Sequence, residues 1–278
     1  MPDFPSPDRV MNIAHRGAPS LAPENTLAAA QKAAEVGADM WELDLQATRD
    51  GEIVAVHDPT LERTSNAAVV FPGRRPWRVG DFTLQELRRL DFGSWFEEAD
   101  PHGQVAAGLI SASDLRRYRG EMIPTLREAL EFSRQNGMGV NAEIKDLSAH
   151  GNTIELLQRL IRGIKELNML DRVIVSSFHH DLLKHIKQLD NNVVTGLLVS
   201  SFRHNPEELL QSVHADAYHP PLGAISQASI RRLQSLGYMV SVWVANDTKT
   251  MTRLIRDRVN GIFTDFPQTL ASLLASPA

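Results

Sequence analysis

The 278-residue sequence contains no cysteine, and its net charge is only −5. Without cysteine the chain has no disulfides, no thiolate zinc site and no cysteine nucleophile. The weak negative charge and the lack of a Lys/Arg run argue against nucleic acid or an anionic membrane surface as a partner. No apolar run is long enough for a transmembrane helix, so we expect no stable membrane anchor. The N-terminus also lacks the basic and apolar segments of a secretory signal, and we expect a cytoplasmic protein.

Several common functional motifs are also missing. The sequence has no GxxxxGK[ST] loop, no GxGxxG after its first predicted strand and no GxSxG elbow. The usual nucleotide-binding and serine-hydrolase interpretations therefore gain no support. The hydrophobic content of 42% over this length permits one large single-core domain or two small ones.

One predicted strand carries two acidic residues among apolar ones. Glu42 and Asp44 are two positions apart, so they share one face of an extended strand. Trp41, Leu43 and Leu45 occupy the other face. Two neighbouring carboxylates in a buried setting repel each other, and a hard cation between them removes that cost. The alternative is a pair of solvated carboxylates on a half-exposed strand.

The chain then turns and returns beside this strand. Asp50-Gly51 is a strong tight-turn dipeptide, and the apolar residues 53–56 follow it. A hairpin of this length brings His57 back to roughly the level of the two carboxylates. The sequence therefore predicts a histidine next to a metal site.

The rest of the chain alternates between predicted strands and helices. Eight strands are expected, beginning at Val10, Met40, Gly139, Arg172, Val193, Ala215, Met239 and Gly261. This alternation and length favour an α/β fold of the (β/α)8 TIM-barrel type, with a doubly wound open sheet as the alternative. Polar or aromatic residues cluster where the strands end, on the face that carries the active sites of barrels: His15, Glu42, Asp44, Glu143, Lys145, Phe178, His219, Trp243 and Asp265.

The domain organisation follows from this pattern. Residues 1–9, with three prolines, are expected to form a flexible tail, and residues 10–278 the barrel domain. Residues 58–124 interrupt the alternation and are expected to form a small insertion over the barrel mouth. A short helix is predicted at residues 84–90.

The predicted metal site needs a third ligand, which Glu143 can supply from a neighbouring strand. Three carboxylates without cysteine suit Mg²⁺ or Ca²⁺ better than zinc. Lys145 shares a face with Glu143, so a structural ion pair between the two is the alternative.

Two histidines are candidates for proton transfer. His15 and His57 both follow strands near the proposed cation, and imidazole exchanges protons near neutral pH. Arg16 offers a planar fork for a phosphate or carboxylate, or else a salt bridge to a nearby acid. Trp243 is a candidate pocket wall or a barrel-interior residue, and Phe178 and His219 are weaker candidates of the same kind.

Taken together, these motifs resemble those of the glycerophosphodiester phosphodiesterase family. They occur in the family's order over nearly the whole chain: His15-Arg16-Gly17, Pro23-Glu24-Asn25-Thr26, Glu42-Leu43-Asp44, His57-Asp58, Asp81-Phe82-Thr83-Leu84, Ile123-Pro124-Thr125-Leu126, Glu143-Ile144-Lys145, Ser176-Ser177-Phe178, Trp243-Val244 and Thr264-Asp265-Phe266-Pro267. The resemblance implies a (β/α)8 barrel with a small insertion after its second strand. It also implies hydrolysis of glycerophosphodiesters to glycerol 3-phosphate and an alcohol, with one divalent cation.

The resemblance assigns roles residue by residue. It implies that His15 and His57 form the acid/base pair, that Glu42, Asp44 and Glu143 bind the metal, that Arg16 and Lys145 bind the phosphate, and that Trp243 lines the pocket. The hypothesis that follows is attack by the glycerol 2-hydroxyl through a cyclic phosphate. The rival hypotheses are a lysophospholipase D type reaction on a longer lipid, and a barrel that binds phosphodiesters without hydrolysing them.

Overall fold

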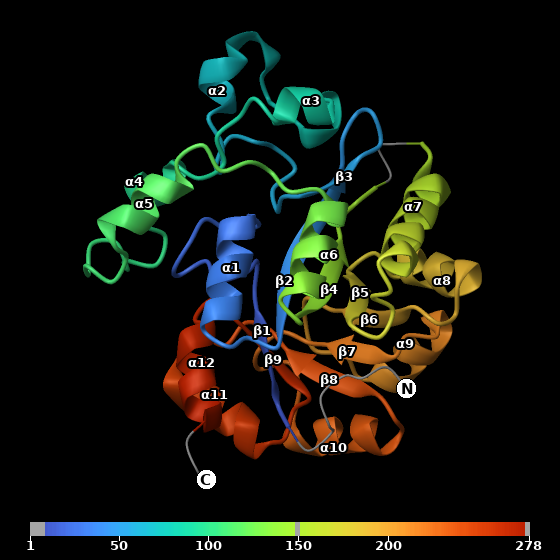
Figure 1. Cartoon of the computed structure of the whole chain (residues 1–278). Coiled ribbons are helices and arrows are strands. Elements are labelled where there is room, and N and C mark those ends of the chain that lie inside the picture. The colour runs from blue at the N-terminus through green and yellow to red at the C-terminus, as the bar shows by residue number, and fades with distance from the viewer. Residues whose placement is uncertain (1–8, 148–150, 276–278) are drawn as a thin grey trace.

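The computed structural model describes residues 9–147 and 151–275. Eight parallel strands form a closed barrel, because β1 pairs with both β2 and β9. Around the barrel from β1 the order is β1, β9, β8, β7, β6, β5, β4 and β2 (Figure 1). The strands are β1 (Met11–Ala14), β2 (Met40–Ala47), β4 (Gly139–Ile144), β5 (Val173–Ser177), β6 (Val194–Leu198), β7 (Ala217–His219), β8 (Met239–Val242) and β9 (Gly261–Thr264). The closure confirms the predicted TIM barrel and excludes the open sheet.

Helices between the strands cover the outside of the barrel, as the fold requires. They are α1 (Leu27–Glu35), α6 (Leu126–Gln135), α7 (Thr153–Glu166), α8 (His180–Leu189), α9 (Pro206–Val213), α10 (Gln227–Ser235), α11 (Thr248–Arg256) and α12 (Pro267–Ala275). Local sequence fixes where several of them begin. Thr26 caps α1 by accepting the N–H of Ala29, and Thr125 and Glu128 form a capping box at α6.

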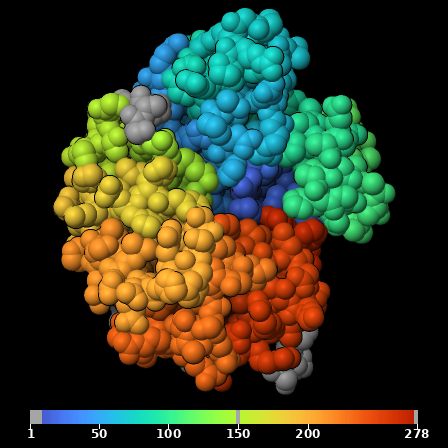
Figure 2. Space-filling model, turned by 180° about the vertical axis from the view of Figure 1, so that it is seen from behind, coloured from blue at the N-terminus to red at the C-terminus, as the bar shows by residue number. Residues whose placement is uncertain are grey.

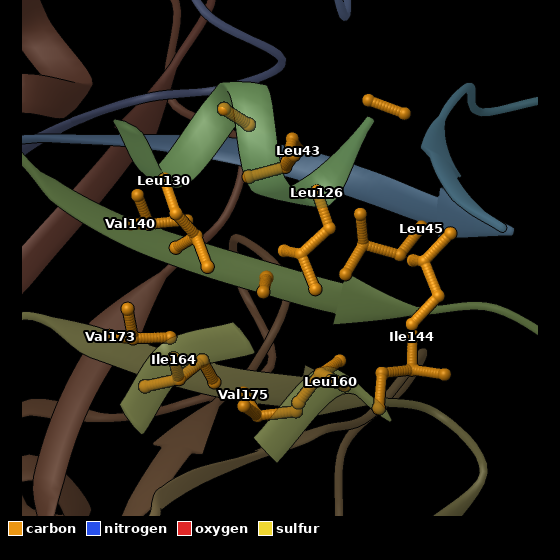
Figure 3. Close-up of a cluster of buried hydrophobic side chains, with 14 of the residues drawn as sticks. Leu43, Leu45, Leu126, Leu130, Val140, Ile144, Leu160, Ile164, Val173 and Val175 are labelled. Carbon is orange, nitrogen blue, oxygen red and sulfur yellow. The ribbon is translucent and has the colours of Figure 1, made fainter. Parts of the chain in front are cut away.

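The main core lies between the sheet and these helices. Figure 3 shows side chains of β2, β4 and β5 packing against α6 and α7, among them Leu43, Leu45, Leu126, Leu130, Val140, Ile144, Leu160, Ile164, Val173 and Val175. Trp41 belongs to the same cluster, and its indole N–H donates to Ser133 at 2.8 Å. The prediction that Trp41, Leu43 and Leu45 share the strand face opposite to Glu42 and Asp44 is therefore confirmed, and that face packs against the helices. The opposite face of β2 carries Met40, which belongs to a second apolar cluster.

The predicted hairpin is also confirmed. β3 (Ile53–Ala55) runs antiparallel to β2, with Ala55 opposite Leu45. The turn uses Gly51 at φ +77°, a left-handed conformation that glycine adopts without strain. β3 is a ninth strand, attached outside the eight of the closed barrel.

The insertion contains more structure than the one predicted helix. It follows β3 and forms α2 (Ala67–Val70), η1 (Pro72–Arg74), η2 (Val79–Asp81), α3 (Leu84–Leu87), α4 (Trp95–Ala99) and α5 (Ala112–Tyr118). In Figure 1 α2 and α3 lie beyond the end of β3, whereas α4 and α5 lie to their left, beside α1. Trp77, Phe82 and Phe92 pack with Val54 of β3, whereas Phe96 packs with Ala29 of α1. Most of the insertion's aromatic side chains thus form its own small cores, which hold it against the barrel.

The predicted flexible tail lies mostly outside the described residues, since the structure describes the chain from residue 9. Arg9 itself pairs with Asp39 at 2.7 Å. Within residues 9–147 and 151–275, no helix combines the length and the apolar character that a membrane crossing requires.

Candidate active site

A pocket lies where the carboxyl ends of the barrel strands meet. It is lined by His15, Arg16, Glu42, Asp44, His57, Asn141, Glu143, Lys145, Phe178, Leu198, Trp243 and Phe263. Figure 2 shows the dark blue N-terminal segment recessed between the cyan insertion and the orange-to-red C-terminal part of the barrel. All predicted site residues except His219 therefore line one pocket.

The three predicted metal ligands converge in this pocket. Glu42, Asp44 and Glu143 are buried, and each offers an oxygen within 4.8 Å of the others. Register explains the convergence, because Asp44 of β2 lies directly beside Glu143 of β4. Burial and the neighbouring Asp44 charge raise the pKa of Glu42 to about 8. Burial, together with Asp44, also raises the pKa of Glu143.

Such a cluster fits a divalent cation. The Oε1 atom of Glu42 is buried and has no hydrogen-bond partner among the described residues. Three convergent carboxylates give the hard oxygen ligands that Mg²⁺ and Ca²⁺ use. An ion of two positive charges would also relieve the repulsion that raises the pKa of Glu42. The buried acidic triad is thus compatible with a divalent metal site.

Lys145 lies between two of the acids. Its ammonium group contacts Glu143 and also lies 2.7 Å from Asp44 Oδ1. Burial alone would raise the pKa of Asp44, but the charges of Lys145 and Arg16 outweigh it and lower that pKa. The ion pair considered as an alternative for Lys145 therefore exists. Glu42 is not in this pair; its Oε2 atom lies 4.0 Å from His15 Nε2 instead.

Arg16 is held by backbone and side-chain contacts at once. Its backbone N–H donates to Glu42 Oε2 at 2.8 Å, and its guanidinium contacts Glu24 at 3.0 Å and Asp44 at 3.4 Å. Arg16 adopts φ +55° and Gly17 follows at φ +89°. This tight left-handed turn directs the Arg16 side chain into the pocket. The salt bridges considered as its alternative role are therefore formed, at the pocket wall.

Each candidate histidine is supported by an aspartate. His15 Nδ1 lies 2.7 Å from Asp265 Oδ1, and His57 Nδ1 lies 2.7 Å from Asp58 Oδ1. Burial lowers the pKa of His15, but the Asp265 hydrogen bond and the Glu42 charge outweigh it, so the net pKa is raised. For His57 burial prevails, and the pKa is lowered. The pKa values of the two rings are therefore shifted in opposite directions.

The weaker candidates differ in their positions. Phe178 and Trp243 line the pocket, with ring centroids 5.6 Å apart at right angles. His219 is fully buried, and its ring packs against Phe263 at 5.2 Å rather than lining the pocket that the described residues form. Burial lowers the pKa of His219 to about 3. Its backbone carbonyl accepts a hydrogen bond from the Trp243 indole N–H at 2.9 Å, so His219 helps to fix the orientation of the Trp243 ring.

Comparison with known proteins identifies the family of the chain. Residues 15–269 match the Glycerophosphoryl diester phosphodiesterase family. The chain belongs to this family. It is 35% identical over 266 residues to a glycerophosphodiester phosphodiesterase of Caldanaerobacter subterraneus subsp. tengcongensis, covering 96% of this chain and 98% of that one. A Bacillus subtilis glycerophosphodiester phosphodiesterase is 30% identical over 273 residues, covering 94% and 85%.

Solved structures agree with the sequence relatives. An Oleispira antarctica phosphodiesterase, solved in complex with the product sn-glycerol-3-phosphate, superposes with a TM-score of 0.79 at 28% identity. The match covers 96% of this chain and 97% of that one. The resemblance inferred from the motifs is therefore confirmed, and the chain is an enzyme of the glycerophosphodiester phosphodiesterase type.

Sequence reasoning missed the residues that hold this phosphodiesterase pocket in place. Asp58 and Asp265 occur in recognised motifs, yet their contacts with the histidines had no signal in the sequence. Asn25 both donates to and accepts from Asp44, at 2.8 and 3.0 Å. Asn141 lines the pocket, and its position two residues before Glu143 on the same strand could have indicated this.

Proposed function

We propose that this chain hydrolyses glycerophosphodiesters to glycerol 3-phosphate and an alcohol, and that the reaction depends on a divalent cation. The observation that carries the proposal is the convergence of two aspartate-supported histidines on one buried acidic triad. A phosphodiester is anionic, so it needs positive charge to bind and proton transfer to react.

Glu42, Asp44 and Glu143 would hold the cation in the pocket. When bound, the cation would neutralise charge on the phosphate oxygens as a Lewis acid. Arg16 and Lys145 bring two further positive groups to the same pocket. Their N–H groups would donate to the phosphate oxygens and stabilise the charge that develops during displacement.

The opposite pKa directions of the histidines suggest their roles. His57, whose pKa is lowered, would accept the proton of the glycerol 2-hydroxyl. The freed oxygen would attack phosphorus, forming a cyclic phosphate as the bond to the leaving alcohol breaks. His15, whose pKa is raised, would give its proton to that alcohol. Water would then open the ring with the two roles reversed, which restores both histidines.

The two rival functions gain no specific support. The aromatic insertion residues that a lipid tail would contact are largely packed in the insertion's own cores, as Trp77, Phe92 and Phe96 are. Val69, Leu109 and Met122 are exposed, but none of them lines the pocket. A binding barrel without turnover would not need two aspartate-supported histidines. The cytoplasmic location stays a prediction from the sequence.

The test is release of glycerol 3-phosphate by purified protein. Glycerophosphocholine, glycerophosphoethanolamine and a lysophospholipid would be offered first with EDTA and then with Mg²⁺ or Ca²⁺. We expect turnover of the two glycerophosphodiesters that disappears with EDTA and returns with one of the cations. Faster turnover of the lysophospholipid would favour the lipid reaction instead. A folded protein without turnover of any substrate would contradict the proposal.

A further inference from the structure

An arginine outside the pocket lining joins two parts of the site. Arg63 follows β3 at the start of the insertion, and 42% of its side chain is exposed. Its guanidinium contacts Asp58 at 2.6 and 3.2 Å and Glu24 at 2.7 and 2.8 Å. It thus uses several donors of its planar group on two carboxylates from different loops.

The first carboxylate leads to His57. Asp58 holds Arg63 through Oδ2 at 2.6 Å and approaches His57 Nδ1 through Oδ1 at 2.7 Å. Burial raises the pKa of Asp58, but the hydrogen bonds from Arg63 and His57 outweigh it and keep the carboxyl ionised. An ionised carboxylate only accepts, so the ring hydrogen of His57 lies on Nδ1 and the lone pair on Nε2.

The second carboxylate leads to Arg16. Glu24 Oε1 accepts from Arg63 at 2.7 Å and from Arg16 Nη1 at 3.0 Å. Glu24 is therefore shared between two arginines. If Arg63 were absent, the whole charge of Glu24 would act on Arg16 and compete with the phosphate for its guanidinium.

A tryptophan ring of the insertion also lies against this arginine. The guanidinium carbon of Arg63 lies 5.8 Å from the centroid of the Trp95 ring in α4. Trp95 itself packs with Phe96, which belongs to the cluster that joins the insertion to α1. The position of Arg63 therefore depends on the folded insertion as well as on the barrel loops.

We propose that Arg63 is a positioning residue. It orients the His57 ring through Asp58 and limits the pull of Glu24 on Arg16, and so couples the insertion to the catalytic pocket. The inference rests on the proposed function for its kinetic readout. It gives the insertion a role in catalysis although none of its residues lines the pocket that the described residues form. In an ordinary surface ion pair the carboxylate has no further contact with an active-site residue, and the pair contributes little to stability.

The experiment compares Arg63→Gln with Arg75→Gln, which is a matched control. Arg75 also lies in the insertion, pairs with a carboxylate (Glu62, 3.5 Å) and lies 5.6 Å from a tryptophan ring (Trp77). Its contacts do not lead to the pocket residues described above. Arg63→Lys serves as the conservative variant, since an ammonium keeps the charge but not the planar fork.

We expect Arg63→Gln to lower kcat for glycerophosphocholine roughly 10- to 100-fold, the usual cost of losing a partner that orients an active group. KM should rise, because Glu24 would then compete with the phosphate for the Arg16 guanidinium. Arg63→Lys should recover part of the change in kcat and part of the change in KM. Nitrogen NMR of the metal-free protein should show His57 with its hydrogen on Nδ1 in the wild type and as a tautomer mixture in Arg63→Gln. Arg75→Gln should match the wild type in all three measurements.

Normal kinetics together with an unchanged His57 tautomer in Arg63→Gln would overturn the inference. If Arg63→Gln does not fold, the same measurements on Arg63→Lys test the proposal. Wild-type kcat, KM and His57 tautomer in that variant would contradict it. The NMR readout needs no turnover. A wild type that hydrolyses no glycerophosphodiester would therefore defeat the proposed function, while the ring tautomer would still report on Arg63.

Discussion

Replacing Glu42 by glutamine should stabilise the metal-free protein at high pH while removing its function. Burial first, and the Asp44 charge second, raise the pKa of Glu42 from 4.5 to about 8. At pH values below its unfolded-state pKa, Glu42 is protonated in both the folded and the unfolded chain and does not lower the free energy of unfolding. As the pH rises from there, the unfolded chain releases the proton while the folded chain keeps it, so stability falls until the folded-state pKa is passed.

The size of this effect follows from the shift. One pKa unit corresponds to about 1.4 kcal/mol, so the cost above the folded-state pKa approaches about 5 kcal/mol. The glutamine amide keeps an oxygen that can accept the Arg16 N–H, as Glu42 Oε2 does. We therefore expect Glu42→Gln to be more stable than the wild type by about 2–5 kcal/mol near pH 9, and nearly equal to it near pH 5.

Urea unfolding of chelator-treated protein at the two pH values measures this difference. Glu52→Gln is the control, since Glu52 is an exposed glutamate paired with Arg159 on the outside of the barrel. Its effect should not follow the same pH dependence. Added Mg²⁺ or Ca²⁺ should stabilise the wild type and not Glu42→Gln. A Glu42→Gln variant that is less stable than the wild type near pH 9 would refute the reasoning that the acidic triad is electrostatically strained.

Three further predictions concern the residues around the triad. His15→Ala and His57→Ala should each lower kcat roughly 10²–10⁴-fold, measured as glycerol 3-phosphate release, and near-normal rates in both would contradict the acid/base assignment. Asp265→Asn should lower kcat roughly 10- to 100-fold with an unchanged melting temperature, because the amide can still accept from His15 but lacks the negative charge that raises the pKa of His15; wild-type kcat would show that this charge is dispensable. Gly17→Ala should destabilise the fold by about 1–3 kcal/mol in urea unfolding, because its Cβ would lie 2.6 Å from the Ala29 Cβ at φ +89°; an unchanged midpoint would contradict that clash.

The barrel could be predicted because its determinants are local and periodic. The two-residue period of β2 separates Glu42 and Asp44 from Trp41 and Leu43, and the structure keeps that separation. Strand ends then place site residues at one face of a barrel by topology alone. The convergence of most candidate residues in one pocket followed from these two rules and from the family motifs.

The insertion could not be predicted in the same way. Helices as short as α2 (Ala67–Val70) have too few residues for propensity or periodicity to identify them. Their stability comes from packing of aromatic residues such as Phe82 against β3, which is a tertiary effect. For His219, by contrast, the sequence predicted a pocket residue that the structure does not place in the pocket lining. Its place at a strand end suggested the pocket, but the strand's last side chain points into the closed interior beside Phe263.

The supporting contacts of Asp265 and Arg63 were beyond sequence reasoning because they join distant positions. His15 and Asp265 are 250 residues apart in the chain, and Arg63 and Glu24 are 39 apart. Only closure of the barrel brings the first pair together, and only the folded insertion brings the second. Chemical type alone cannot distinguish such a residue from the many ordinary arginines and aspartates of the surface.

The central claim is that this site breaks a glycerophosphodiester by using the substrate's own 2-hydroxyl. The most direct test compares glycerophosphocholine with its analogue lacking that hydroxyl, under saturating cation, while phosphorus NMR follows the products. The account predicts turnover of glycerophosphocholine with a transient cyclic phosphate, and binding without turnover for the analogue. Equal turnover of the two compounds, without a cyclic species, would contradict it.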